Sequence, residues 1–170
     1  MSNKDITLLC TTNSGIRIYN RMKVMWTSKS NNLSEETLIS ALKTVTPSDE
    51  YFTAEIAIAE TLNSTCVETT AADTIEYARR KKRDGFSRMV KNRQPRPTNT
   101  LTVILKKLEG KDSYLLITAF AGEMAPKEPW NCEPDSDEYH ESVNFWKNHA
   151  LLYNADEIAE VAAQTPMYYL

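Results

Sequence analysis

The sequence lacks the features that mark membrane and secreted proteins. None of its hydrophobic runs approaches the roughly 20 residues of a membrane-spanning helix. Its first ten residues, MSNKDITLLC, lack the long apolar core of a signal peptide. The three cysteines, Cys10, Cys66 and Cys132, are isolated and odd in number, which fits a reducing compartment better than a disulfide framework. We therefore expect a cytoplasmic protein that does not enter a membrane.

Motifs for metals, nucleotides and serine nucleophiles are missing too. The cysteines form no zinc-type spacing, and the two histidines, His140 and His149, are nine residues apart, so we expect no metal site. The sequence contains no P-loop, no GxGxxG and no GxSxG elbow. Covalent serine chemistry, NTP binding and dinucleotide binding therefore have no support in the sequence.

What is present suits an ordinary globular protein. The chain has 170 residues, of which 41% are hydrophobic and 25% are charged. This length predicts a single domain over residues 1–170. Within it we separate an N-terminal α/β portion of unknown role, residues 1–70, from a core, residues 71–170.

The net charge of −3 hides a basic segment. Nine basic residues and one acid, Asp84, lie within residues 79–96, giving that segment a charge of +8 and the rest of the chain −11. The basic residues are Arg79, Arg80, Lys81, Lys82, Arg83, Arg88, Lys91, Arg93 and Arg96. Such a run is either the solvated face of a helix or a surface for phosphate or nucleic acid.

Hydrophobic patterns predict an α+β fold. Residues 6–10, 15–26 and 51–62 show apolar runs or alternation typical of strands, with a turn near Asn20. Ser34 is a good N-cap for a helix over EETLISALKTV. Residues 101–108 and 113–121 read as a hairpin, and the second strand is apolar enough to be buried on both faces. We expect a mainly antiparallel sheet centred on this 101–121 hairpin and flanked by helices.

Three further helices are predicted after residue 70. Asp73 is expected to begin a short helix over TIEYARRKKR. A longer helix is expected over residues 139–154, which would hold both histidines, and a last short one over DEIAEVAAQT.

Several polar residues are candidates for chemistry, each with a structural alternative. His149 lies among Phe145, Trp146, Ala150 and Leu151 and is either a packed side chain or a general acid or base. Thr118 interrupts an apolar strand and is either structural or a donor to a phosphate. Glu123 and Glu128, on the loop after that strand, are either a general base with its partner or solvent-exposed residues that keep the loop soluble. Trp130 and Trp146 are either core anchors or platforms on which bases stack.

Three segments together resemble a known superfamily. They are FSRMVKNRQPRPTNTLTVIL, YLLITAFAGEMAPKEPWN and FWKNHALLY. Over about residues 73–152 the chain resembles the barnase–EndoU–colicin–RelE (BECR-like) superfamily of small ribonuclease and toxin domains. The resemblance implies a toxin-like, metal-independent endoribonuclease that needs no cofactor. It would cleave RNA, tRNA among the candidates, by attack of a 2′-OH on the adjacent phosphate, and a cognate inhibitor protein would be a natural partner.

The resemblance also implies roles for particular residues. His149 would be the acid or base, Arg88 would stabilise the phosphate, and Thr118 or Ser87 would hold a phosphate oxygen. Further phosphate contacts are expected from Arg79, Arg83, Lys91 and Arg93. One departure is that many members carry a histidine before the sheet, where this chain has EYARRKKRDG.

Two other functional classes remain open. The incomplete catalytic set and the acidic remainder of the chain also fit a non-catalytic bacterial or phage protein that binds a host protein or nucleic acid. An ADP-ribosyltransferase ranks third, because no convincing Ser-Thr-Ser strand is present.

Overall fold

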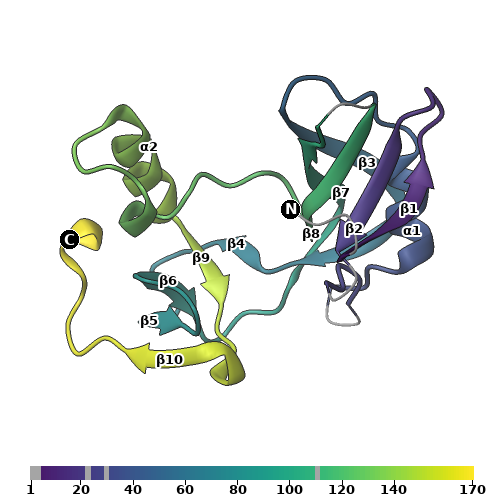
Figure 1. Ribbon diagram of the computed structural model, residues 1–170. Coiled ribbons are helices and arrows are strands. Elements are labelled where there is room, and N and C mark those ends of the chain that lie inside the picture. The colour runs from purple at the N-terminus through teal and green to yellow at the C-terminus, as the bar shows by residue number, and fades with distance from the viewer. Residues whose placement is uncertain (1–4, 22–23, 29–30, 110–111) are drawn as a thin grey trace. The chain divides into compact units, whose positions relative to one another are not determined.

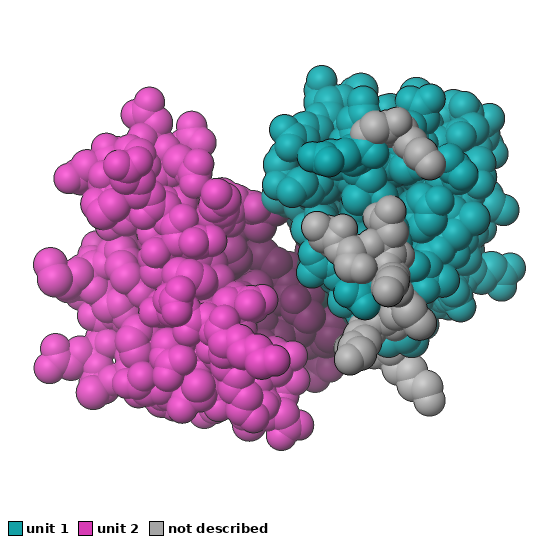
Figure 2. All heavy atoms as spheres, in the orientation of Figure 1, with its two compact units in different colours: residues 1–64, 97–124 teal, residues 65–96, 125–170 magenta. Residues whose placement is uncertain are grey.

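The computed structural model describes residues 5–21, 24–28, 31–109 and 112–170. The fold is α+β, as the sequence predicts, with strands that pair mostly antiparallel in two sheets. The chain divides into two compact units, coloured separately in Figure 2. Unit 1 comprises Met1–Ser64 and Pro97–Met124, and unit 2 comprises Thr65–Arg96 and Ala125–Leu170. These boundaries differ from the division near residue 70 drawn from the sequence, and the single domain stays a prediction.

The sheet of unit 1 is built around the predicted hairpin. Its strand order is β1-β2-β8-β7-β3, seen in Figure 1 as β1 (Ile6–Thr11), β2 (Arg17–Arg21), β8 (Ser113–Ala121), β7 (Arg96–Lys107) and β3 (Tyr51–Ser64). β7 and β8 pair antiparallel from Leu101 opposite Ala121 to Lys107 opposite Tyr114. Four successive β8 residues, Ser113 to Leu116, are buried. The hairpin and its central strand are therefore confirmed, whereas burial on both faces holds for Ser113–Leu116 and not for the exposed Ile117.

Helix α1 (Glu35–Leu42) packs its apolar residues into the core of unit 1. The Ser34 hydroxyl accepts a hydrogen bond from the Thr37 N–H, and two acids occupy the first turn, as expected of a capped N-terminus. The buried α1 residues Leu38 and Leu42 join the β7 residues in one core, against which alternate residues of β3 pack.

The expected strand after the Asn20 turn is wrong for residues 24–26, which form no strand, while residues 22–23 lie outside the described ones. The Asn20 side chain explains the difference: its amide donates to the Val24 carbonyl and its oxygen accepts from the Trp26 indole. These bonds tie residues 24 and 26 to the Asn20 side chain.

Unit 2 has its own sheet, in the order β10-β5-β6-β9-β4. In Figure 1 its strands are β10 (Ile158–Val161), β5 (Ile75–Arg80), β6 (Phe86–Val90), β9 (His149–Leu152) and β4 (Cys66–Glu68). Helix α2 (Asp137–Trp146) and the single-turn 3-10 helices η2 (Pro129–Asn131), η3 (Ala155–Glu157) and η4 (Met167–Tyr169) complete the unit. Val67, Val90 and Ala150 form its small buried cluster.

The helix predicted from Asp73 is wrong, because the segment is strand β5. Its backbone pairs with β6 on one side and with β10 on the other. The Asp73 carboxylate accepts from the Thr70 N–H and so closes a turn instead of capping a helix. Pairing on two sides outweighs the helix propensity of alanine, arginine and lysine.

Of the two C-terminal helix predictions, the first is partly wrong and the second is wrong. Helix α2 begins at Asp137, capped by Ser136, and ends at Trp146, so His140 is helical but His149 is the first residue of β9. The last predicted helix is the short η3 turn followed by strand β10. In both places residues with moderate helix propensity complete the sheet, since β9 fills the gap between β6 and β4.

Candidate functional site

The basic segment folds into the β5–β6 hairpin and the loop after it, and several of its cations are already paired. Three predicted phosphate-binding residues form ion pairs within unit 2: Arg79 Nε with Glu160 Oε1 at 3.4 Å, Lys91 Nζ with Glu76 Oε2 at 2.9 Å, and Arg93 Nη1 with Asp73 Oδ2 at 3.1 Å. These carboxylates offset the positive charge before any phosphate arrives.

The pairing changes the ionisation of two of these groups. The Thr70 backbone N–H, and after it the Arg93 guanidinium, lower the pKa of Asp73, whose side chain is only 5% exposed. The Glu76 carboxylate raises the pKa of Lys91 through a hydrogen bond and its charge. Both groups therefore keep their charges near neutral pH, which fits a structural role for each.

Arg88 lies at the centre of the sheet of unit 2. Its Nη1 donates to the Thr69 hydroxyl at 2.7 Å and to the His149 carbonyl at 3.0 Å. In the β5–β6 register Arg88 faces Tyr77, so both side chains lie on the same face of the hairpin. The guanidinium thus joins the end of β4 to the start of β9 and lies beside the backbone of His149.

His149 is half-buried and held in a defined orientation. Its ring stacks on Phe145, with centroids 3.9 Å apart and planes 4° apart. Its Nδ1 lies 2.8 Å from the Phe145 carbonyl oxygen. A carbonyl only accepts, so Nδ1 carries the proton, which leaves Nε2 as the accepting nitrogen of the neutral ring. This is the tautomer that a general base requires.

The two predicted hydroxyl candidates differ in position. Thr118 is a half-buried residue of β8 and belongs to unit 1, whereas Ser87, Arg88 and His149 belong to unit 2. Ser87 is fully buried, pairs with Ala78 across the hairpin, and its hydroxyl has no partner among the described residues. Arg88 contacts His149 through the backbone carbonyl, whereas the β6–β9 register places the two side chains on opposite faces of the sheet.

A second polar cluster lies on the opposite face of the hairpin, around Arg80 and Glu128. Arg80 Nη2 lies 2.7 Å from Glu128 Oε2, and the two side chains are 24% and 11% exposed. Within the described part of the chain, four buried side-chain atoms have no hydrogen-bond partner, and all belong to unit 2: Arg80 Nε, Ser87 Oγ, Glu128 Oε1 and Trp130 Nε1. Buried polar atoms of this kind are uncommon in folded proteins.

Helix α2 holds the segment that carries Glu128 and Trp130. The Ser142 hydroxyl donates to the Lys127 carbonyl at 2.5 Å, and the Trp146 indole donates to the Pro126 carbonyl at 3.3 Å. The Trp130 side chain lies so close to Gly85 that a Cβ there would be 2.1 Å from Trp130 Cγ. Trp130 is thus packed against the hairpin turn and is a structural anchor.

Two C-terminal tyrosines close the same region. Tyr168 and Tyr169 place their hydroxyls 3.3 and 3.2 Å from the Phe86 carbonyl oxygen. The ring of Tyr169 packs on Tyr77 with centroids 5.0 Å apart. Burial first, and then the negative charge of Glu128, raises the pKa of Tyr169. These side chains occupy the part of the β6 edge that β9, paired only with Met89 and Val90, leaves open.

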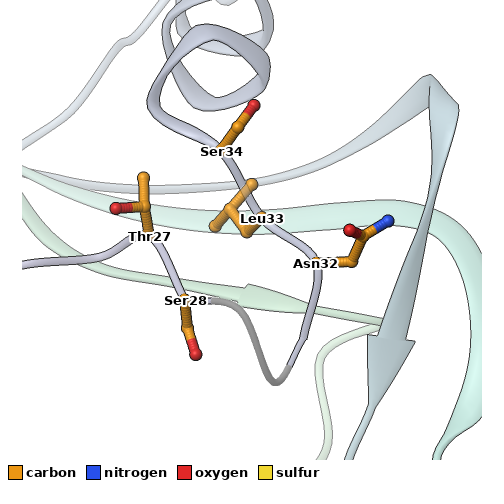
Figure 3. Close-up of a pocket in the computed structure, with 5 residues that line it drawn as sticks. All are labelled: Thr27, Ser28, Asn32, Leu33 and Ser34. Carbon is orange, nitrogen blue, oxygen red and sulfur yellow. The ribbon is translucent and has the colours of Figure 1, made fainter.

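Each unit has a surface cavity. The cavity of unit 2 has a volume of about 350 Å³ and is lined by Arg80, Lys81, Lys82, Arg83, Asp156 and Glu157. The cavity of unit 1, shown in Figure 3, has a volume of about 310 Å³ and lies beside the start of α1. There the Asn32 amide donates to the Thr61 carbonyl and Ser34 caps the helix, so both side chains are engaged in holding the fold.

A search of the described residues finds no group of three or more histidine, cysteine, aspartate or glutamate side chains that could hold a metal ion. No helix in the described ranges is long and apolar enough to cross a membrane.

No protein-family model matches the chain, and no curated protein is similar to it.

Sequence reasoning missed the Arg80–Glu128 pair and the contact of Trp130 with Gly85. The partners are 48 and 45 positions apart in the chain, and no local pattern connects them. The sequence offers only a weak indication of the pair. Glu128 lies between Lys127 and Pro129 on a loop, where an acidic residue is usually exposed to solvent.

Proposed function

We propose that the protein is a metal-independent, toxin-like endoribonuclease whose reaction is carried out by unit 2. One observation supports this most directly. The Arg88 guanidinium donates to the backbone carbonyl of His149, and the half-buried imidazole of the same residue is held with Nε2 as its accepting nitrogen. Cleavage of RNA through its own 2′-OH needs a base and a cation at the phosphate, and no cofactor.

In this mechanism His149 Nε2 takes the proton of the 2′-OH while the 2′-oxygen forms a bond to the adjacent phosphorus. The bond from phosphorus to the 5′-oxygen breaks, and that oxygen takes up a proton from solvent. The products are a 2′,3′-cyclic phosphate and a 5′-hydroxyl. The N–H groups of Arg88 that do not bind Thr69 or His149 stabilise the charge on the phosphate oxygens. RNA as the substrate, a cognate inhibitor as a partner and a cytoplasmic location belong to this proposal.

The test is cleavage of cellular RNA and of purified tRNA in the presence of EDTA. We expect wild-type protein to leave cyclic phosphate ends and His149→Ala to lose activity by about 10²–10⁴-fold, the usual contribution of a general base. Arg88→Lys keeps the charge but loses the fork geometry, and we expect it to lower activity too. His140→Ala, at an exposed residue of α2, is the matched control. Absence of cleavage by folded wild-type protein would rule the proposal out.

A second function, non-catalytic binding of a host protein or nucleic acid, is favoured by a different observation. Arg79, Lys91 and Arg93 are ion-paired, and the chain outside residues 79–96 carries −11. Much of the basic segment therefore serves the fold, and the acidic surface suits a basic partner. Recovery of one specific partner by a protein that cuts no RNA would favour this function.

A further inference from the structure

The cavity of unit 2 is bordered by cations that the fold does not use. The turn between β5 and β6 holds Lys81, Lys82 and Arg83, all exposed. Among the described residues none of these three side chains forms an ion pair, in contrast to Arg79, Arg80, Lys91 and Arg93. Three adjacent cations without an ion-pair partner at one cavity are available to bind a phosphate.

The turn itself is fixed in place. The Lys81 N–H donates to the Glu157 carbonyl at 2.7 Å, and Arg79 Nη1 donates to the Arg83 carbonyl at 3.2 Å. Lys82 has a φ of 64°, in the left-handed region that a lysine adopts rarely. A lysine in this conformation costs conformational free energy that asparagine or glycine would reduce, so its presence has no structural advantage in the turn.

Two acids limit what the cavity accepts. Asp156 and Glu157 line it together with the cations, and carboxylates accept hydrogen bonds but repel a second anion. A ligand that suits both kinds of lining residue has one phosphate for the cations and N–H groups for the carboxylates. A nucleotide has this combination, because bases carry N–H donors on their edges. A volume of about 350 Å³ is at the low end for small-molecule sites, which limits the occupant to a single unit.

We propose that this cavity binds one nucleotide unit of single-stranded RNA, with its phosphate at Lys81, Lys82 and Arg83 and its base edge at Asp156 and Glu157. The inference rests on the proposed ribonuclease function and adds a substrate-binding subsite to it. This subsite is separate from Arg88 and His149, so it contributes affinity and not chemistry.

The test measures binding of a fluorescent 2′-O-methyl RNA hexamer, which cannot be cleaved by 2′-OH attack, at several salt concentrations. The variant is Lys81→Ala, Lys82→Asn, Arg83→Ala, with asparagine chosen because it tolerates the left-handed φ. Each phosphate contact on a single strand contributes about 0.7 to the slope of log affinity against log salt. Because one phosphate occupies the cavity, we expect the triple variant to lose about 0.7 from that slope and Arg83→Ala alone to lose a part of it.

Lys147→Ala, an exposed lysine of unit 2 outside the cavity, is the matched control and should leave the slope unchanged. An unchanged slope in the triple variant, with circular dichroism showing a folded protein, would overturn the inference. For the two acids, Asp156→Asn with Glu157→Gln should weaken RNA binding but tighten binding of an abasic ribose-phosphate hexamer. Equal changes for both ligands would show that the carboxylates contact no base.

These outcomes separate the subsite from the ribonuclease function. If wild-type protein binds the hexamer through the cavity but cuts no RNA, the ribonuclease proposal fails and the subsite stands. If wild-type protein cuts RNA and the triple variant binds with the same affinity and slope, the subsite fails and the ribonuclease proposal stands.

Discussion

At the scale of single residues, Glu128 carries the clearest energetic consequence. It is 11% exposed and its charge faces Arg80, which is 24% exposed. Removing one partner of a largely buried ion pair leaves the other charge without compensation. Because both side chains are still partly exposed, we expect the loss of folding free energy to be about 3 kcal/mol. We therefore expect Glu128→Gln to lower the free energy of unfolding by about 3 kcal/mol, measured by urea denaturation.

Glu138→Gln is the matched control for that loss. Glu138 lies 3.9 Å from Lys127, and the two side chains are 56% and 63% exposed. Exposed pairs contribute less than about 1 kcal/mol, so this variant should unfold almost as wild type does. Equal losses in the two variants would show that the Arg80–Glu128 pair is no more buried in solution than a surface pair.

Asp73 predicts a pH dependence with a definite sign. Its pKa in the folded protein is lower than its ordinary value of 3.8. A lowered pKa stabilises the fold at pH values above 3.8, and this stabilisation is lost as the pH falls through the folded-state pKa. The urea midpoints of wild type and Asp73→Asn should therefore differ at pH 7 and converge below pH 3.8. A difference that is constant with pH would contradict the role of the charged carboxylate.

At the scale of elements, the contact between Gly85 and η2 determines how the loop packs on the hairpin. A Cβ at residue 85 would lie 2.1 to 2.5 Å from three Trp130 atoms, so either the tryptophan or the turn has to move. Overpacking of this kind costs about 1–3 kcal/mol, and we expect Gly85→Ala to lose that much stability in urea denaturation.

A second substitution tests whether the clash is the cause. Trp130→Ala removes the obstructing side chain, so adding Gly85→Ala to it should cost much less than adding Gly85→Ala to wild type. The double-mutant cycle measures this coupling directly. Additive losses would show that Gly85 matters for a reason other than Trp130.

Elements were predictable from the sequence wherever a local signal decides them. Ser34 caps α1 as expected, and the apolar alternation after residue 51 gives β3. The segment after Asp73 was not predictable, because residues with good helix propensity become a strand through pairing with β6 and β10. The start of β9 at His149 was equally hidden, since no glycine or proline lies between Trp146 and His149 to end the helix.

The candidate site follows the same division. Arg88 and His149 were candidates because of their residue types and because of the superfamily resemblance that we propose. The partners that define their chemistry, the Thr69 hydroxyl and the Phe145 carbonyl, come from the folded arrangement of β4, α2 and β9. The Arg80–Glu128 pair was missed because ion pairs between distant segments leave no periodic pattern in a single sequence.

At the scale of the whole molecule, the two units are each assembled from two separate stretches of the chain. The boundaries fall after residues 64, 96 and 124, so the chain passes from one unit to the other three times. Each unit has its own sheet and its own buried cluster. Two separate cores allow the two units to unfold independently. The single domain predicted from the sequence would instead unfold as one cooperative structure.

Hydrogen exchange distinguishes these two behaviours, with Glu128→Gln as the perturbation. The substitution lies in unit 2, so if the units are separate cooperative structures it should speed exchange in the strands of residues 65–96 and 125–170. The amides of β8 and the rest of unit 1 should then exchange at the wild-type rate, because their opening does not require unit 2 to unfold. A uniform acceleration in both units would instead show one cooperative domain. In that case the stability of the Arg80–Glu128 pair would also determine the stability of the sheet built on the 101–121 hairpin.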